Sequence, residues 1–289
     1  MCSQFTGVFR VMTKSVTQIS NIKQIFKKDW FCVGRASALA KPGDYVTCDL
    51  AEQPVIILRD HDNNLRAMSN VCRHRMSTLL SGRGSAKVIV CPYHAWTYNL
   101  DGSLRGAPAM NANKAFCKNQ YRLPTIACEE WLGWVFINLN PDAKPVSKEL
   151  VEVEQLVKGY DMSNYSETFF EEHLWDTNWK ILAVCHAGTI GGLSKLDEMI
   201  CPPGRKAFNY HTILKDKSLR IAMAHQDNNR LKGEERRTTY LLAIYPSLLI
   251  TLTPGYFWYL SLHPKGPSKV HIRFGGGMSN DYKDDKEAQ

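Results

Sequence analysis

The stretch Cys72-Arg73-His74 is followed, after sixteen intervening residues, by Cys91-Pro92-Tyr93-His94, and this pattern is the strongest chemical signal in the chain. Each half stands at the end of a segment with strand character, so two short loops are expected to face each other. Thiolate sulfur and imidazole nitrogen are ligands that tetrahedral zinc or an iron–sulfur cluster takes, and the spacing alone leaves both open. Cys72, His74, Cys91 and His94 are therefore predicted to hold a metal centre.

The residues on either side of this motif predict a small all-β unit that runs from Trp30 to about Asn140. Turn residues such as Lys41-Pro42-Gly43-Asp44, His61-Asp62-Asn63-Asn64 and Asp101-Gly102 stand between short apolar runs, where hairpins need them. The predicted strands are Tyr45–Leu50, Pro54–Leu58, Leu65–Val71, Lys87–Cys91, Trp96–Leu100 and Trp131–Leu139.

A second unit is expected after Asn140–Pro145, because two prolines in six residues disfavour helix and strand alike. Apolar residues then recur at helical spacing from Ser147 to Gly159. Farther on, β-branched and aromatic stretches between turns indicate antiparallel sheet over 239–253, 256–263 and 269–274. The predicted fold class is α+β, with an N-terminal extension at 1–28, an all-β domain at 29–142 and a sheet-plus-helices domain at 143–289.

The composition is that of a folded protein: of 289 residues, 44% are hydrophobic and 22% charged, which excludes wholesale disorder. The longest apolar run, Leu241 to Leu252, is shorter than the roughly 18 apolar residues that a membrane span needs, so no membrane segment is expected. Nine cysteines without the even spacing of a disulfide scaffold indicate a reducing, cytoplasmic compartment. The net charge of +8 comes without a nucleic-acid-binding motif and suits an acidic protein partner.

The two loops, Cys72-Arg73-His74-Arg75 and Cys91-Pro92-Tyr93-His94-Ala95-Trp96, resemble the cluster-binding loops of Rieske 2Fe–2S proteins. In such centres two histidines replace two cysteines on one iron, which raises the reduction potential from about −400 mV toward roughly −150 to +300 mV. The resemblance implies that Cys72 and Cys91 hold one iron and that His74 and His94 hold the other. Respiratory Rieske proteins carry an extra cysteine in each loop, and this chain has none there, so the oxygenase type fits better.

The resemblance extends to the second domain, where Asn178-Trp179-Lys180 is similar to the element that opens the catalytic domain of Rieske non-haem iron oxygenases, in their terminal (alpha) subunits. In that family two histidines and a carboxylate hold a mononuclear iron and leave open positions for oxygen and substrate. His186 is the one histidine in range here, and the family spacing puts Gly191 where the second is expected. The catalytic-type domain is therefore expected to be incomplete, with an internal gap and a shortened C-terminus. Carboxylates in range are those of Asp281, Asp284 and Asp285.

Two functions follow from this pattern. The first is a terminal oxygenase that receives electrons through the 2Fe–2S cluster and hydroxylates or demethylates a small organic substrate with O2 at a mononuclear Fe(II). The second is a truncated or variant Rieske electron-transfer protein without a working mononuclear iron. The resemblance also implies a homotrimer and a ferredoxin or flavin-dependent NAD(P)H reductase as the electron donor. Aromatic residues such as Trp258 suit an aromatic substrate or a quaternary ammonium equally well.

Overall fold

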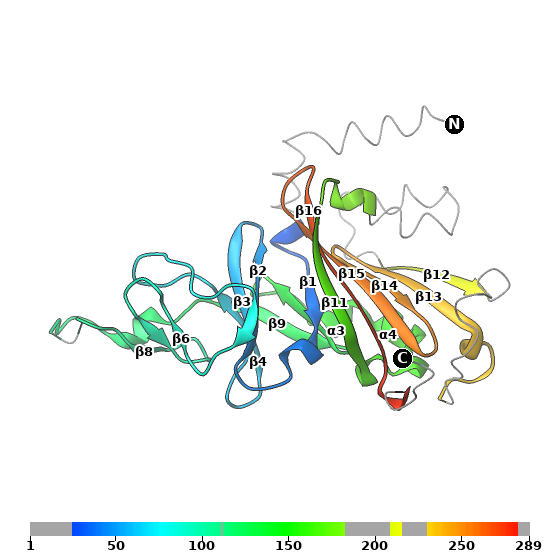
Figure 1. Cartoon of the computed structure of the whole chain (residues 1–289), viewed down its shortest axis with the longest axis horizontal. Coiled ribbons are helices and arrows are strands. Elements are labelled where there is room, and N and C mark those ends of the chain that lie inside the picture. The colour runs from blue at the N-terminus through cyan, green and yellow to red at the C-terminus, as the bar shows by residue number, and fades with distance from the viewer. Residues whose placement is uncertain (1–24, 111, 183–208, 216–229, 283–289) are drawn as a thin grey trace.

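Strands dominate the computed structural model, which describes residues 25–110, 112–182, 209–215 and 230–282 (Figure 1). These residues form a seven-stranded, a six-stranded and a three-stranded sheet, and every strand pair in them is antiparallel. The mostly antiparallel architecture with few helices confirms the predicted fold class. No helix in the described ranges is both long and apolar enough to cross a membrane.

The seven-stranded sheet belongs to the first predicted domain and contains the hairpins expected from the turn residues. Its strands, in spatial order, are β1 (Phe31–Arg35), β10 (Trp134–Asn138), β9 (Thr125–Trp131), β4 (Leu65–Ser69), β3 (Gln53–Arg59), β2 (Asp44–Leu50) and β5 (Arg83–Ser85). The prediction of one strand over 131–139 is wrong at its start. Leu132 and Gly133 have φ values of 48° and 76°, so the chain turns there and β9 pairs with β10 as a hairpin.

The three-stranded sheet carries the second predicted loop and lies at one end of the long axis of the molecule (Figure 1). It consists of β6 (Ile89–Val90), β7 (Thr97–Tyr98) and β8 (Leu104–Gly106). The turn expected at Asp101-Gly102 separates β7 from β8, because Gly102 has a φ of 85° and the Asp101 carboxylate accepts the Ser103 N–H. Strands β6 and β7 are shorter than predicted, since the loop residues between them bond to each other instead.

The six-stranded sheet forms most of the second domain at the other end of the molecule (Figure 1). In spatial order its strands are β11 (Tyr165–Trp175), β16 (Val270–Ser279), β15 (Tyr256–Pro264), β14 (Leu248–Leu252), β13 (Thr238–Ile244) and β12 (Asn209–Lys215). The predicted helix after Ser147 is two short helices, α3 (Val146–Glu149) and α4 (Val151–Leu156), because Leu150 leaves the helical conformation with φ −109° and ψ 16°. The described chain also contains short 3-10 helices: η2 (Ala36–Leu39), η3 (Lys118–Tyr121), η4 (Lys158–Tyr160), η5 (Met162–Asn164), η7 (Gly233–Arg237) and η8 (Asn280–Tyr282).

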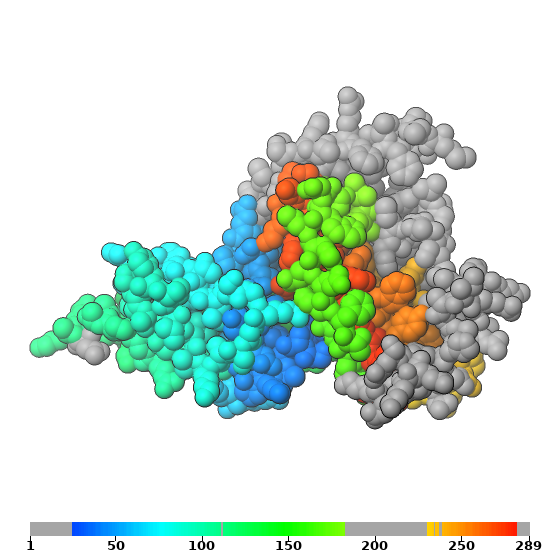
Figure 2. Space-filling view, viewed as in Figure 1, coloured from blue at the N-terminus to red at the C-terminus, as the bar shows by residue number. Residues whose placement is uncertain are grey.

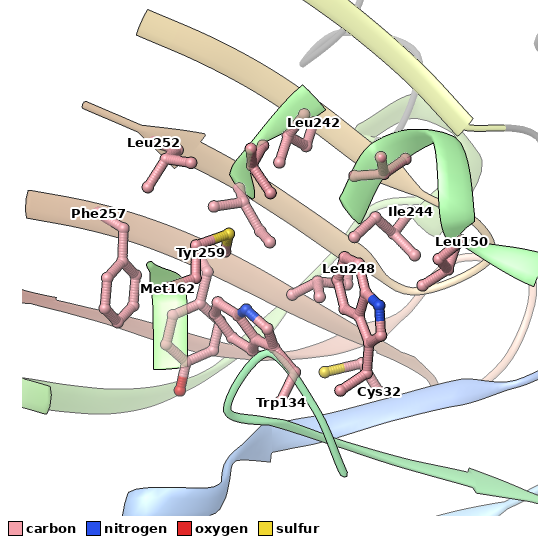
Figure 3. Close-up of a cluster of buried hydrophobic side chains, with 14 of the residues drawn as sticks. Cys32, Trp134, Leu150, Met162, Leu242, Ile244, Leu248, Leu252, Phe257 and Tyr259 are labelled. Carbon is pink, nitrogen blue, oxygen red and sulfur yellow. The ribbon is translucent and has the colours of Figure 1, made fainter. Parts of the chain in front are cut away.

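The hydrophobic core joins residues from both sides of the predicted domain boundary. Figure 3 shows Trp134 of β10 and Cys32 of β1 beside Tyr259 and Leu248 of the six-stranded sheet. The rings of Trp134 and Tyr259 meet edge to face at 4.7 Å. Because large aromatic surfaces are buried here, this contact fixes how the two large sheets sit on each other. Figure 2 shows the lobe that carries the predicted metal loops projecting away from this junction.

Candidate metal centre

Both predicted ligand loops have the same backbone design, built around their cysteines. The Cys72 N–H donates to the Ser77 carbonyl at 2.8 Å, and the Cys72 carbonyl accepts the Met76 N–H at 3.1 Å. In the second loop the Cys91 N–H donates to the Trp96 carbonyl at 2.8 Å, and the Cys91 carbonyl accepts the Ala95 N–H at 3.0 Å. Met76 and Ala95 have positive φ values of 56° and 54° at matching places. Two copies of one tight loop therefore present a cysteine and a histidine each.

The two cysteine side chains lie deepest in the centre. Cys72 and Cys91 are 0% and 2% exposed, and their sulfurs are within hydrogen-bonding reach of each other. Burial by itself raises the pKa of Cys91, but the backbone N–H groups of Tyr93 and His94 donate to its sulfur, and these bonds bring the pKa of the thiol below its ordinary value. The loop thus stabilises a thiolate, which is the form that binds metal.

A tyrosine supports the other thiol. The Tyr98 hydroxyl lies 3.3 Å from the Cys72 sulfur and accepts the Arg73 N–H at 3.0 Å. Burial and the bond to Cys72 raise the pKa of Tyr98, so the phenol stays protonated and can donate to the sulfur. Tyr98 lies two residues after the second quoted loop, and its role was not predicted, because its partner Cys72 lies 26 residues away in the sequence.

The two histidine rings lie side by side nearer the surface. Their centroids are 4.7 Å apart, and the His74 ring stacks on the buried Trp96 ring at 4.8 Å with an interplanar angle of 4°. Desolvation of the ring, together with the electrostatic influence of His74 and Arg75, lowers the pKa of His94 and favours the neutral imidazole. The His94 Nδ1 atom is buried and has no hydrogen-bond partner within the described part of the chain.

These four side chains fit a binuclear cluster better than a single zinc ion. Among the described residues, no three of the His, Cys, Asp and Glu side chains come close enough together to hold one metal ion. A Rieske cluster requires two cysteines on one iron and two histidines on the other, so each metal atom takes two protein ligands. The unpartnered His94 Nδ1 is the kind of nitrogen that a metal would satisfy. The assignment of Cys72, His74, Cys91 and His94 as the cluster ligands stays a prediction.

The predicted mononuclear iron site lies largely outside the described residues. His186, Gly191, Asp284 and Asp285 belong to segments that the structure does not describe. Helical structure does begin at Trp179, where the Asn178 side chain accepts the Lys180 N–H at 3.0 Å and Trp179 itself is buried.

The described carboxylates and histidine near this segment already have other partners. Asp281 pairs with Arg230 at 2.9 Å, and Asp176 lies 3.7 Å from Lys269. His173 bonds to Glu171 at 2.8 Å on the surface of β11. Each of these groups therefore belongs to a solvated surface, and the structure does not bring Asp281, Asp176 and His173 together.

Comparison with known proteins agrees with this geometry. Residues 29–126 match the model of the Rieske [2Fe-2S] domain. The carnitine monooxygenase oxygenase subunit of Acinetobacter pittii is 46% identical over 129 residues, which cover 44% of this chain and 35% of that protein. The benzene 1,2-dioxygenase alpha subunit of Pseudomonas putida is 25% identical over 310 residues, covering 91% of this chain and 68% of that protein.

A solved structure extends the likeness to the second domain. The apo form of a quaternary ammonium Rieske monooxygenase superposes with a TM-score of 0.74 and 25% identity, over 96% of this chain and 76% of that one. The chain thus spans about a third of the length of the carnitine monooxygenase subunit in sequence, while its fold follows most of the monooxygenase structure. The chain therefore carries a Rieske [2Fe-2S] domain over residues 29–126, and as a whole it is similar to the oxygenase (alpha) subunits of Rieske non-haem iron oxygenases.

Proposed function

We propose that the chain is a terminal oxygenase component, which accepts electrons through a Rieske 2Fe–2S cluster held by Cys72, His74, Cys91 and His94. The observation that carries this proposal is the layered ligand set, with two contacting thiols buried beneath two adjacent imidazoles. When bound, such a cluster supplies a reversible one-electron store. The two imidazoles are the ligands nearest the solvent, so they give an electron the shortest path in.

The protein around this centre excludes water from the two sulfurs and fixes the ligand side chains. Trp96 is 2% exposed and holds the His74 ring by stacking, while its own ring is packed edge-on by Phe116 and Tyr121. Exclusion of water strengthens each hydrogen bond to the sulfurs, because the local dielectric constant is low. The chain's residues therefore orient the ligands and stabilise their charged forms.

We further propose O2-dependent hydroxylation or demethylation of a small organic substrate in the second domain, at a mononuclear iron that includes His186. The names of the relatives favour a quaternary ammonium compound over an aromatic ring. Trp258 of β15 and Phe169 of β11 are compatible with that choice: they are 46% and 44% exposed and both stand opposite Gly276 in the sheet. Exposed aromatic faces attract quaternary ammonium groups. A cytoplasmic homotrimer served by a ferredoxin or a flavin-dependent NAD(P)H reductase completes the proposal.

The test is an iron and acid-labile sulfide assay on the purified full chain, together with electron paramagnetic resonance after dithionite reduction. A reduced Rieske cluster is expected to give a signal with an average g below about 2, and about three irons per two sulfides are expected if the mononuclear site is filled. A colourless protein that contains zinc would refute the cluster.

A second candidate function is electron transfer alone. It is favoured by the sequence after Lys180, where Gly191 stands at the position that the family spacing gives to a second iron histidine. This candidate predicts about two irons per two sulfides and no turnover of trimethylammonium substrates, with the cluster signal intact. The same assay therefore separates the two functions.

A further inference from the structure

The two ligand loops are closed differently behind their cysteines. In the second loop, β6 and β7 continue the closure as a regular ladder of two residue pairs. In the first loop, the ladder is one isolated bridge between Val71 and Thr78, outside any strand. Such a bridge fixes the two arms of a loop less firmly than a ladder, because fewer backbone bonds join them. The first loop therefore depends on a further contact at its base.

Asn70 makes this contact with both its side chain and its backbone. It stands directly after β4 and is 3% exposed. Its side-chain amide donates to the Leu80 carbonyl at 2.8 Å, and its side-chain oxygen accepts the Leu80 N–H at 2.9 Å. The Asn70 N–H donates to the Pro54 carbonyl of β3 at 2.8 Å, and the Asn70 carbonyl accepts the Leu79 N–H at 3.1 Å. One residue thus joins both arms of the first loop and ties them to β3.

A primary amide is the side-chain group that this position requires. Leu80 presents one backbone donor and one backbone acceptor, and the amide of Asn70 meets both at once. Because Asn70 is buried, its two bonds are shielded from water and are stronger than they would be at the surface. The matching position in the second loop is taken by Ile89, which is 0% exposed and closes that loop through the backbone ladder. The two loops thus reach the same shape by different means.

The loop that Asn70 closes carries two of the predicted ligands, Cys72 and His74. Since these ligands lie within three residues, a displacement at the base of the loop moves both of them relative to the second loop. The structure brings the sulfurs of the two loops within hydrogen-bonding reach and their histidine ring centroids to 4.7 Å. A preorganised site needs its ligands held to within about 0.5 Å. The base of the first loop is therefore where the spacing between the two ligand pairs is set.

We propose that Asn70 is a positioning residue of the cluster, whose bonds to Leu80 hold Cys72 and His74 at the spacing from the second loop that two bridged irons require. The proposal rests on the cluster of the proposed function. Asn70 acts through the loop backbone, so it takes up no electron and no proton. Loss of its side chain is expected to change the spectrum and the retention of the cluster, which destabilisation elsewhere in the lobe does not do.

The experiment compares N70A with D60N in the full chain. Both variants remove buried hydrogen bonds from the first lobe, but the side-chain bonds described for Asp60 stay within residues 60–66. N70A is expected to lose the cluster to a ferrous-iron chelator about tenfold faster than the unmodified chain, because two hydrogen bonds at the loop base are gone. Its electron paramagnetic resonance signal after dithionite reduction is expected to have shifted g values. D60N is expected to keep both the signal and the retention of the cluster.

Amide hydrogen exchange tests the same proposal without relying on the cluster. In N70A the amides of Leu79 and Leu80 are expected to exchange about tenfold faster, while those of Cys91 and Ala95 in the second loop keep their rates. If N70A unfolds as a whole, N70D replaces it, since N70D keeps an acceptor for the Leu80 N–H but loses the donor to its carbonyl, and the same differences are expected.

The possible failures are distinguishable. A D60N chain that loses its cluster as fast as N70A, or exchange that rises equally in both loops, would overturn the role of Asn70. So would an N70A chain with the signal and the retention of the unmodified chain. Absence of the cluster signal in the unmodified chain would instead refute the proposed function, whereas the exchange rates would still show whether Asn70 closes the first loop.

Discussion

At the scale of single residues, Cys72 and Cys117 give a matched pair of thiols in the same lobe. Cys72 is fully buried in the first ligand loop, whereas Cys117 is exposed just before η3. C72A is expected to lose the cluster, because one iron would keep only one protein ligand. C117A is expected to keep it. Visible absorption together with iron and sulfide content checks both, and a C72A protein with full cluster content would contradict the ligand assignment.

Tyr98 is predicted to set the reduction potential of the centre. A hydrogen bond to thiolate sulfur stabilises the more negatively charged, reduced state, and the Tyr98 hydroxyl lies 3.3 Å from the Cys72 sulfur. Y98F removes this donor and keeps the ring. If the lost hydrogen bond stabilises the reduced state by about 1 kcal/mol, the reduction potential is expected to fall by about 40 mV for one electron.

A redox titration followed by electron paramagnetic resonance measures this shift. Y121F is the control, since Tyr121 packs on Trp96 in the same lobe and the structure gives it no contact with either sulfur. Equal potentials in Y98F and the unmodified chain would remove Tyr98 from the set of residues that tune the cluster.

At the scale of elements, Asp60 organises the hairpin between β3 and β4. It is 2% exposed, and its carboxylate accepts the N–H groups of Asp62 and Asn64 and the side chain of Arg66. Burial alone raises its pKa, but these bonds hold the pKa of Asp60 below its ordinary value of 3.8. Its stabilising contribution is therefore complete above about pH 5 and is lost as the pH falls through the lowered pKa.

D60N is predicted to lower the free energy of unfolding by about 1–3 kcal/mol at pH 7, because the amide keeps the shape but loses the charge that Arg66 and the two N–H groups require. Urea unfolding at pH 7 and at successively lower pH measures the difference. The gap between the two proteins is expected to narrow below pH 3.8. A gap that does not change with pH would show that geometry, and not charge, is responsible.

The elements that were predicted correctly are those whose turns are determined by residues close together in the sequence. Asp101-Gly102 and His61–Asn64 placed their hairpins correctly, because Gly, Asn and Asp adopt the required backbone conformations at low cost. Strand β11 was not predicted, since its polar and aromatic residues alternate irregularly and its register with β16 shifts between Glu167 and Phe169. Its existence depends on β16, which follows it by about a hundred residues, and a local pattern does not contain that information.

The candidate site also has a part that could be predicted from the sequence and a part that could not. The cluster loops could be predicted because two of the four ligands lie within three residues of each other in each loop, and each loop closes on its own backbone. The support from Trp96 and Tyr98 could not, because stacking and sulfur bonds depend on how β7 packs against the first loop. The predicted iron site around His186 involves ligands far apart in the sequence, for which no local spacing is sufficient.

At the scale of the whole molecule, the two lobes are held together by polar contacts as well as by the shared core. Arg35 is the last residue of β1, and its side chain donates to the carbonyls of Met162 and Tyr165 at 3.1 and 2.7 Å. Its guanidinium also lies over the Trp134 ring at 4.7 Å. In β1 the Cys32 N–H donates to the Ser247 hydroxyl, and the Cys32 carbonyl accepts the Ser261 hydroxyl. The first lobe thus relies on the second for the partners of its buried groups.

A fragment that ends at Asp142 is therefore predicted not to fold as the first lobe does in the full chain. It would expose Trp30, Cys32, Trp134 and Phe136, all 5% exposed or less in the whole molecule, and would leave Arg35 without its acceptors at Met162 and Tyr165. Loss of this burial removes about 1.5–3 kcal/mol for each large side chain, which is a large part of the stability of a small domain. We expect the fragment to bind the dye ANS and to unfold without a sharp transition. The full chain is expected to unfold in a sharp transition and not to bind the dye. Cooperative unfolding of the fragment, with a midpoint equal to that of the full chain, would show that the first lobe is an independent domain.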